Sequence, residues 1–197
     1  MASPPVPYFS LNVGELEPDD AGRVWVLQAD QQTKVHLHKD SIESLTLAMD
    51  MADTVFPTAI FQLKNLRVLL LPMRGFRSIP QGISQLKRLE TLDINHGALV
   101  SLPDDFCQLS SLKSASFLYS PLERLPDRIG ELKKLEMLHL GFTRITALPE
   151  SMQHLSALKS LLLQNTPDQP HLSQEAVEQL KTNLPNCNIH YRIVAVQ

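Results

Sequence analysis

The sequence LPDRIGELKKLEMLHLGFTRITALP, residues 125–149, begins and ends with leucine–proline pairs that are 23 residues apart. The same spacing continues outward from this stretch, because prolines stand at the start of five consecutive 23-residue units. These prolines are Pro57, Pro80, Pro103, Pro126 and Pro149. A fixed period of this length indicates a repeat protein, in which each unit buries its apolar face by stacking against its neighbours.

Apolar residues recur in each unit at seven positions counted from the proline, namely +3, +6, +9, +12, +14, +19 and +22. Only Asp168 and His171, both in the last unit, break this pattern. Positions +12 and +14 have the period of a strand, whereas +3, +6 and +9 have the rhythm of a 3₁₀ or short helical turn. Each unit is therefore predicted to contain a short strand and a loosely helical return segment, with neighbouring strands about 4.8 Å apart.

This pattern resembles the leucine-rich repeat family in its 23-residue form, LPxxIxxLxxLxxLxLxx[N]xLxxLP, and is similar to repeats of Ras-group and Scribble-like intracellular scaffolds and of small bacterial proteins. The resemblance implies an α/β solenoid: a right-handed superhelix in the shape of a curved horseshoe. A parallel sheet would line its concave face and the return segments its convex face. The family's asparagine at +17 is replaced here by Arg74, Gly97, Ser120, Thr143 and Thr166. The three hydroxyl side chains are predicted to bond to the local backbone.

The segments that flank the repeats predict caps. Upstream, residues 24–38 alternate around a polar turn, as in a β-hairpin, and Leu45 and Leu47 lie at the strand spacing of a degenerate first repeat. Downstream, Ser173 is the predicted N-cap of a helix, and a strand follows it. The helix would bury Val177, Leu180 and Leu184, and the strand alternates Ile189, Tyr191 and Ile193.

The predicted organisation has four parts. Residues 1–7 form a flexible tail, and residues 8–56 form an N-terminal cap with the β-hairpin and the degenerate repeat. Residues 57–171 form the five repeats. Residues 172–197 form a C-terminal helix–strand cap.

The stretch SASFLYS, residues 114–120, places three large apolar side chains in succession. Neighbours on a strand point to opposite faces, so the three cannot share one core. The register predicts that Phe117, at +14, is buried beside the small Ala115 at +12, which preserves core volume. Leu118, at +15, is predicted to face the concave side, and Tyr119, at +16, to lie on the rim with its hydroxyl in water.

The concave face is predicted to carry positions +11, +13 and +15, because +12 and +14 point inward. Beside it, the +16 row reads Met73, His96, Tyr119, Phe142 and Asn165, without an acid, lysine or arginine. Two interpretations of this row remain: it packs under the adjoining loop as the rim of the core, or it is an apolar stripe that contacts a partner. The predicted partner-binding residues are Leu70, Met73, Asp93, His96, Leu118, Tyr119, Met137, His139, Phe142 and Leu162.

No motif in the sequence points to catalysis: a P-loop, a GxSxG motif and an HExxH motif are all missing. His96 and His139 lie two repeats apart, roughly 10 Å by strand spacing, which is too far for two ligands of one zinc ion. Cys107 and Cys187 are separated by more than the reach of a disulfide and are predicted to be free thiols. We therefore predict no enzyme activity, cofactor or metal.

Charge and composition exclude several classes of partner. The net charge of −3 gives no electrostatic argument for nucleic acid or an anionic membrane. Basic residues recur at +7 and +8, for example Lys64 and Lys133–Lys134, either as a solvated outer face or as a contact for anions or membranes. The absence of a long apolar run, of a signal sequence and of cysteine pairs predicts a cytoplasmic protein.

The predicted function is a non-catalytic protein–protein interaction module, a leucine-rich repeat scaffold or adaptor that binds a protein or peptide on its concave face. The alternative is a bacterial effector or signalling regulator that uses the same surface to engage host proteins. Neither the partner nor the oligomeric state follows from the repeats, because a scaffold does not imply a function.

Overall fold

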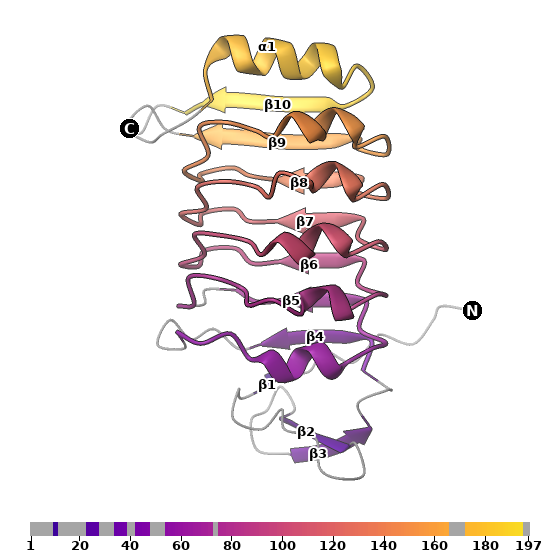
Figure 1. Ribbon diagram of the computed structural model, residues 1–197. Helices are drawn as coiled ribbons and strands as arrows, with labels where there is room; N and C mark the ends of the chain where they lie inside the picture. Colours follow the sequence, from indigo (N-terminus) through magenta and orange to yellow (C-terminus); the bar gives the residue numbers. More distant parts are fainter. Residues whose placement is uncertain are drawn as a thin grey trace, which may run out of the picture.

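The computed structural model describes residues 10–11, 23–27, 34–38, 42–47, 54–72, 75–165 and 172–194. These residues form a stack of repeats built on one sheet, with the strand order β10-β9-β8-β7-β6-β5-β4-β1-β2-β3 (Figure 1). Several predicted features lie outside the described residues: the tail, Asp50, which the sequence places in the asparagine slot of the degenerate first repeat, Met73, Arg74 and residues 166–171.

Seven strands follow one another in sequence order and pair in parallel. They are β4 (Ser44–Leu47), β5 (Val68–Leu70), β6 (Thr91–Asp93), β7 (Ser114–Ser116), β8 (Met137–His139), β9 (Ser160–Asn165) and β10 (Asn188–Ile193). From β5 to β9 each residue pairs with the residue 23 positions later, as Leu92 does with Ala115 and Ala115 with Leu138. The period read from the prolines is therefore the pairing register of the sheet.

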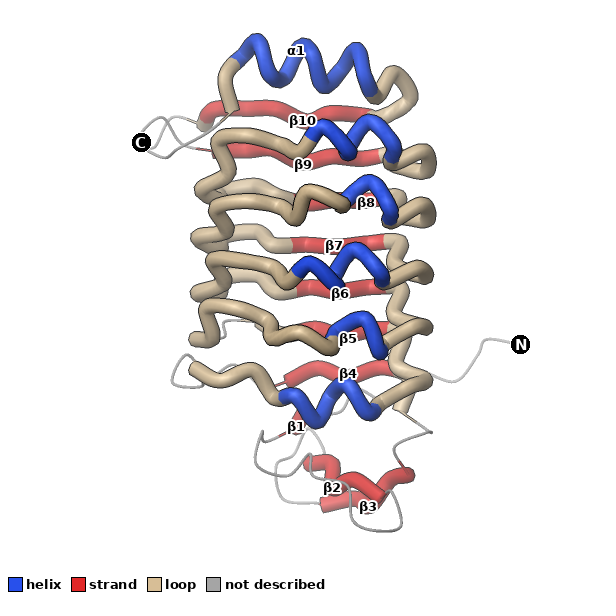
Figure 2. The backbone as a smooth tube through the Cα atoms, viewed as in Figure 1, coloured by secondary structure: helices blue, strands red, loops and turns tan. Residues whose placement is uncertain are grey.

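Five short 3₁₀ helices form the return segments, as the three-residue spacing predicts. They are η3 (Thr58–Gln62), η4 (Ile83–Gln85), η5 (Asp104–Gln108), η6 (Ile129–Glu131) and η7 (Glu150–His154). All five lie on the same face of the sheet (Figure 2). Among the described residues, no helix lies on the opposite face of the parallel strands.

The core lies between the sheet and the return segments. In the five repeats, every described residue at +3, +6, +9, +12 and +14 is buried, as predicted. In the third repeat the rings of Phe106 and Phe117 meet edge to face, with centroids 6.0 Å apart, and Ala115 is fully buried beside them. Two large rings and one small side chain thus fill the space that leucines and isoleucines fill in the neighbouring repeats.

A row of alternating charges runs along the sheet at position +10, just before each strand. It reads Glu43, Arg67, Glu90, Lys113, Glu136 and Lys159. Glu90 joins Arg67 and Lys113 with N–O distances of 2.7 Å, and Lys159 joins Glu136 at 2.6 Å. Each of these exposed pairs contributes little to stability. The alternation of charge nevertheless disfavours a pairing of strands that skips one repeat, because like charges would then lie side by side.

The two ends of the stack carry further described elements. β2 (Arg23–Leu27) and β3 (Lys34–His38) pair antiparallel, and β1 (Ser10–Leu11), which the sequence did not predict, lies between β4 and β2. At the other end, α1 (Gln174–Asn183) begins at Ser173, whose Oγ accepts a hydrogen bond from the amide of Ala176. Among the described helices, none has the length and apolarity needed to cross a bilayer.

Candidate interaction surface on the sheet

The face of the sheet opposite the 3₁₀ helices carries the side chains at +11, +13 and +15, and we call it the open face. Most of the predicted binding residues lie on it: Leu70, Asp93, His139 and Leu162 at +13, Leu118 at +15 and Met137 at +11. All six are at least partly accessible, and Met137 is 40% exposed. The structure therefore places these residues on one surface, as the register predicts.

An aromatic ladder, made of His96, Tyr119 and Phe142, runs along the edge of the open face. The rings of His96 and Tyr119 stack with centroids 4.5 Å apart, and those of Tyr119 and Phe142 with centroids 4.4 Å apart and planes within 5°. Tyr119 is 48% exposed, His96 is exposed and Phe142 is partly exposed. The interpretation of the row as buried rim is therefore wrong for Tyr119, which stays exposed although its ring stacks on both neighbouring rings.

Each residue of the ladder has a left-handed backbone, with φ of 56° at His96, 55° at Tyr119 and 56° at Phe142. This conformation costs roughly 1–2 kcal/mol for residues other than glycine. Hydrogen bonds to the next repeat hold it, because the amide of His96 donates to the carbonyl of Leu118 at 2.8 Å and that of Tyr119 to the carbonyl of Gly141 at 3.1 Å. Contacts between repeats, rather than local preference, therefore select this turn.

The left-handed turn also directs position +17 inward. Ser120 and Thr143 are buried, and their hydroxyls donate to the carbonyls of Phe117 at 2.6 Å and Leu140 at 2.8 Å. The predicted local bonds are thus confirmed at these two positions, and Thr166 lies outside the described residues. Each hydroxyl closes its own repeat instead of linking to the next one.

The fifth repeat ends the ladder. Its strand β9 stays extended through Asn165, so this residue points inward and is buried, and its Nδ2 donates to the carbonyl of Thr143 at 3.3 Å. Of the two interpretations left open for the +16 row, Asn165 follows the buried one. Without the left-handed turn, strand alternation brings the +16 side chain into the position that +17 takes elsewhere.

Two neighbouring residues support the turn before Tyr119. Oδ1 of Asn95 accepts hydrogen bonds from the amide of Leu118 at 2.7 Å and from the hydroxyl of Ser116 at 2.9 Å. Leu118 in turn lies over Gly141, where an added Cβ would be 2.9 Å from Leu118 Cδ2. Glycine at this position leaves room for the leucine on the open face.

Burial shifts the protonation of two polar groups on the open face. It raises the pKa of Asp93, although a hydrogen bond from the amide of Asn95 and the nearby His139 and His96 act in the opposite direction. Burial lowers the pKa of His139, and the Asp93 carboxylate only partly offsets this. Both groups are thus biased towards their neutral forms, as expected for side chains with limited access to water.

Replacing His139 with glutamine is expected to flatten the dependence of the melting temperature on pH between about pH 7 and pH 5. The folded pKa of His139 is lowered, so the unfolded chain takes up this proton first, near the ordinary value of about 6.5. Stability is therefore lost as the pH falls through about 6.5, until the lowered folded pKa is passed. Thermal melts of both proteins across this range measure the effect, and parallel curves would contradict it.

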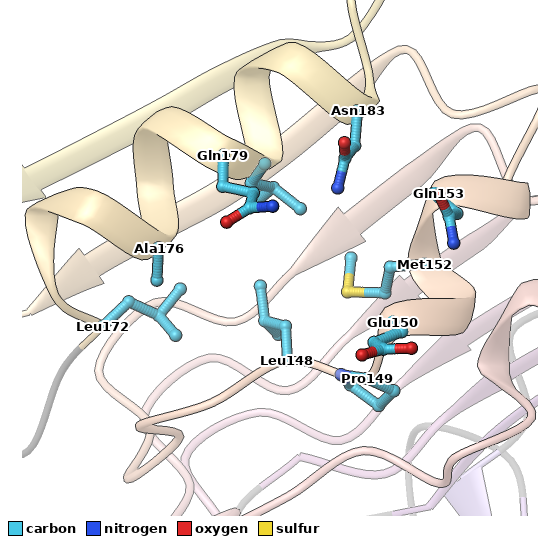
Figure 3. Close-up of a pocket in the computed structure, with 10 residues that line it drawn as sticks. Leu148, Pro149, Glu150, Met152, Gln153, Leu172, Ala176, Gln179 and Asn183 are labelled. Atoms are coloured by element: carbon cyan, nitrogen blue, oxygen red, sulfur yellow. The ribbon is translucent and has the colours of Figure 1, made fainter.

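A cleft of about 250 Å³ lies between α1 and η7 (Figure 3). Leu148, Met152 and Leu172 form its apolar lining, and Glu150 is its one ionisable side chain. A second cavity of about 440 Å³ near η3 is lined by one ionisable residue, Arg77. Neither cavity joins two titratable groups of the kind that acid–base catalysis needs.

Both cysteines are free, as predicted, and burial raises their pKa values, that of Cys107 to about 12. The reactive thiolate is therefore scarce at neutral pH. Within the described ranges no cluster of three or more His, Cys, Asp or Glu side chains is arranged to hold a metal ion.

The basic residues at +7 and +8 lie on the side of the return segments, where three of them bond to neighbouring repeats. Lys64 donates to Gln85, Arg88 to Asn65 and Lys133 to the carbonyl of His154, at 2.8–3.0 Å. These contacts favour the interpretation of a solvated face whose long side chains tie the repeats together.

Comparison with solved structures finds repeat proteins of the same architecture. An internalin (inlF) from Listeria monocytogenes aligns with a TM-score of 0.63 and 19% identity, over 79% of this chain and 43% of that one. TLR13 in a complex with ssRNA13 aligns with a TM-score of 0.62 and 24% identity, over 79% of this chain and 23% of that one. Toll from Drosophila, in a complex with Spatzle, aligns with a TM-score of 0.62 and 22% identity, over 80% of this chain and 21% of that one.

These three structures are leucine-rich repeat proteins. This protein has the leucine-rich repeat fold. The family resemblance of the 23-residue pattern is thereby confirmed at the level of the fold. No protein-family model and no curated protein matches the sequence. The leucine-rich repeat chain spans less than half of each of these three neighbours.

Proposed function

We propose that this leucine-rich repeat protein is a non-catalytic interaction module that binds a protein or peptide on its open face. The observation that carries the proposal is the exposed aromatic ladder of His96, Tyr119 and Phe142. Three successive repeats hold these rings outward, although the left-handed backbone at each position is unfavourable for residues other than glycine. Strained backbone conformations cluster at binding sites, where the surrounding structure has to impose them.

The surface beside the ladder has the composition of an interface centre. Leu118, Met137 and Leu162 accompany the rings on the open face. Positions +11 to +16 of the five repeats contain no lysine and no arginine, and Asp93 is their one acid. Aromatic residues and methionine are enriched at interface centres, where charged residues are depleted.

The same composition favours a protein or peptide over a nucleic acid. Of the neighbours, TLR13 was solved with ssRNA13 and Toll with Spatzle. Nucleic-acid binding draws most of its affinity from lysines and arginines that neutralise phosphates. On this face the five repeats offer an acid and an apolar stripe where such cations would be needed.

Catalysis, a cofactor and membrane contact are not part of the proposed function. The two cavities described above lack paired titratable groups, and both thiols are held protonated by burial. Two free cysteines favour a reducing compartment such as the cytoplasm. The likeness to an internalin is one of fold alone, so it does not favour the alternative of a bacterial effector.

The test is a double substitution, Tyr119→Asn with Phe142→Asn, followed by affinity purification. Asparagine tolerates the left-handed backbone, so the exchange removes the rings without imposing new strain. We expect the variant to keep its circular dichroism spectrum and to lose at least tenfold in affinity for the partner that the wild type captures.

The matched control is Lys87→Ala with Lys134→Ala, two exposed positions on the side of the return segments. This control is expected to retain the partner. Equal capture by the wild type and the asparagine variant would contradict binding through the ladder.

A further inference from the structure

Two oppositely charged side chains on the open face have no ion-pair partner in the described part of the chain: Asp93 on β6 and Arg192 on β10. This sets them apart from the +10 row, where Glu90 alone joins two cations. Charged groups left unpaired on an otherwise apolar surface are candidates for contacts with a partner.

Asp93 is the acidic end of this surface. Its carboxylate is half-buried at +13, beside the amide of Asn95, and the titratable side chains that act on it are His96 and His139 rather than a lysine or arginine. A carboxylate with reduced hydration gains more from an added cation than an exposed one does. A basic group of a partner placed here would provide Asp93 with the ion pair that no described lysine or arginine of this protein provides.

Arg192 is the basic end. It pairs in register with Gln164, so it extends the +15 column of the open face by one strand, and His190 extends the +13 column beside Leu162. Arg192 and His190 are exposed, whereas Ile189 and Tyr191 pack on the core. Strand alternation therefore directs the arginine to the same face as Leu118 and Asp93.

The distance between the two charges follows from the strand order. β6 and β10 are separated by four strand spacings of about 4.8 Å, so the charges lie about 20 Å apart along the stack. The strands between them are mostly three residues long, which makes the strip about 10 Å wide. An extended chain covers 20 Å with about six residues, whereas a helix needs about thirteen and is 10–12 Å wide.

We propose that the partner is an extended peptide segment lying along the stack of strands. A basic side chain of the peptide contacts Asp93, and an acidic side chain of the peptide contacts Arg192. Between them, apolar or aromatic side chains of the peptide lie over Leu118, Tyr119 and Met137. This inference rests on the proposed function and adds the chemistry, the length and the orientation of the ligand. The charges at the two ends set which way the segment runs.

The experiment is a selection from a displayed library of random 12-residue peptides on the full chain. We expect enriched peptides to carry a Lys or Arg and an Asp or Glu five to seven residues apart, with apolar residues between them. Binding of such a peptide should fall about tenfold in Asp93→Lys. A peptide with its basic residue changed to glutamate should recover binding to that variant. Arg192→Glu should show the corresponding preference at the other end.

The outcomes separate this inference from the proposed function. Peptides that lose binding in the Tyr119→Asn, Phe142→Asn variant but carry no charge pair overturn the inference and leave the proposed function standing. A longer library that enriches a charge pair about thirteen residues apart, the helical spacing, also overturns the inference without touching the proposed function. The same holds for a selection that enriches no peptide. Enriched peptides that bind the asparagine variant and Asp93→Lys with the same affinity as the wild type count against both the inference and the proposed function.

Discussion

Replacing Gly130 with alanine is expected to lower the free energy of unfolding by about 3 kcal/mol, the upper part of the range for overpacked sites. Gly130 lies in η6, where an added Cβ would be 2.0 Å from the carbonyl oxygen of Ser151 and 2.8 Å from its carbonyl carbon. Both atoms belong to the backbone of η7, so no side chain can rotate to make room. The fourth and fifth repeats would have to move apart.

For a chain of this length, such a loss lowers the melting temperature by roughly 6–12 °C. Thermal melts followed by circular dichroism measure it. The matched control is Gln153→Ala, which changes the same +4 position in the next repeat, where the side chain is exposed. That control is expected to stay within about 0.5 kcal/mol of the wild type. A Gly130→Ala protein as stable as its control would show that η6 and η7 are not packed this closely.

Replacing Phe117 with alanine is expected to cost about 3–5 kcal/mol, the range for deleting a buried ring. Phe117 is fully buried, meets Phe106 edge to face, and has the small Ala115 beside it. Alanine at this position would therefore leave a cavity beside the ring of Phe106. The backbone carbonyl of Phe117 accepts a hydrogen bond from the hydroxyl of Ser120, and alanine keeps this acceptor.

Phe117→Leu is the control for this prediction, because it keeps most of the buried volume and should cost less than about 1.5 kcal/mol. Urea unfolding of the three proteins gives the difference, and the peptide-binding assay shows whether the alanine variant also weakens the ladder. A loss that is the same for alanine and leucine would mean that the ring does not fill the core as described.

The sequence predicted the fold well because the repeat encodes burial directly. The apolar residues at +12 were expected to form one buried column along the stack, and those at +14 a second one. Each of these described residues is buried. Within residues 114–120, Ala115 and Phe117 are buried and Leu118 lies on the open face, as the register predicts. Tyr119, for which a buried and an exposed placement were both open, is exposed, and Ser116, predicted to face outward, is buried. Local period and hydrophobicity were sufficient for the core positions.

The sequence alone thus determined the repeat length, the register of the parallel sheet and the residues that face its core. The tertiary structure decided the left-handed turns at His96, Tyr119 and Phe142, the stacking of their rings and the inward turn of Asn165. The same holds for the contact of Gly130 with Ser151 and for Asp93 and Arg192 as the two ends of one face. The reason is physical: these features depend on atoms about 20 residues or more away along the chain, which become neighbours only when the repeats stack, whereas core positions follow from the polarity of each residue.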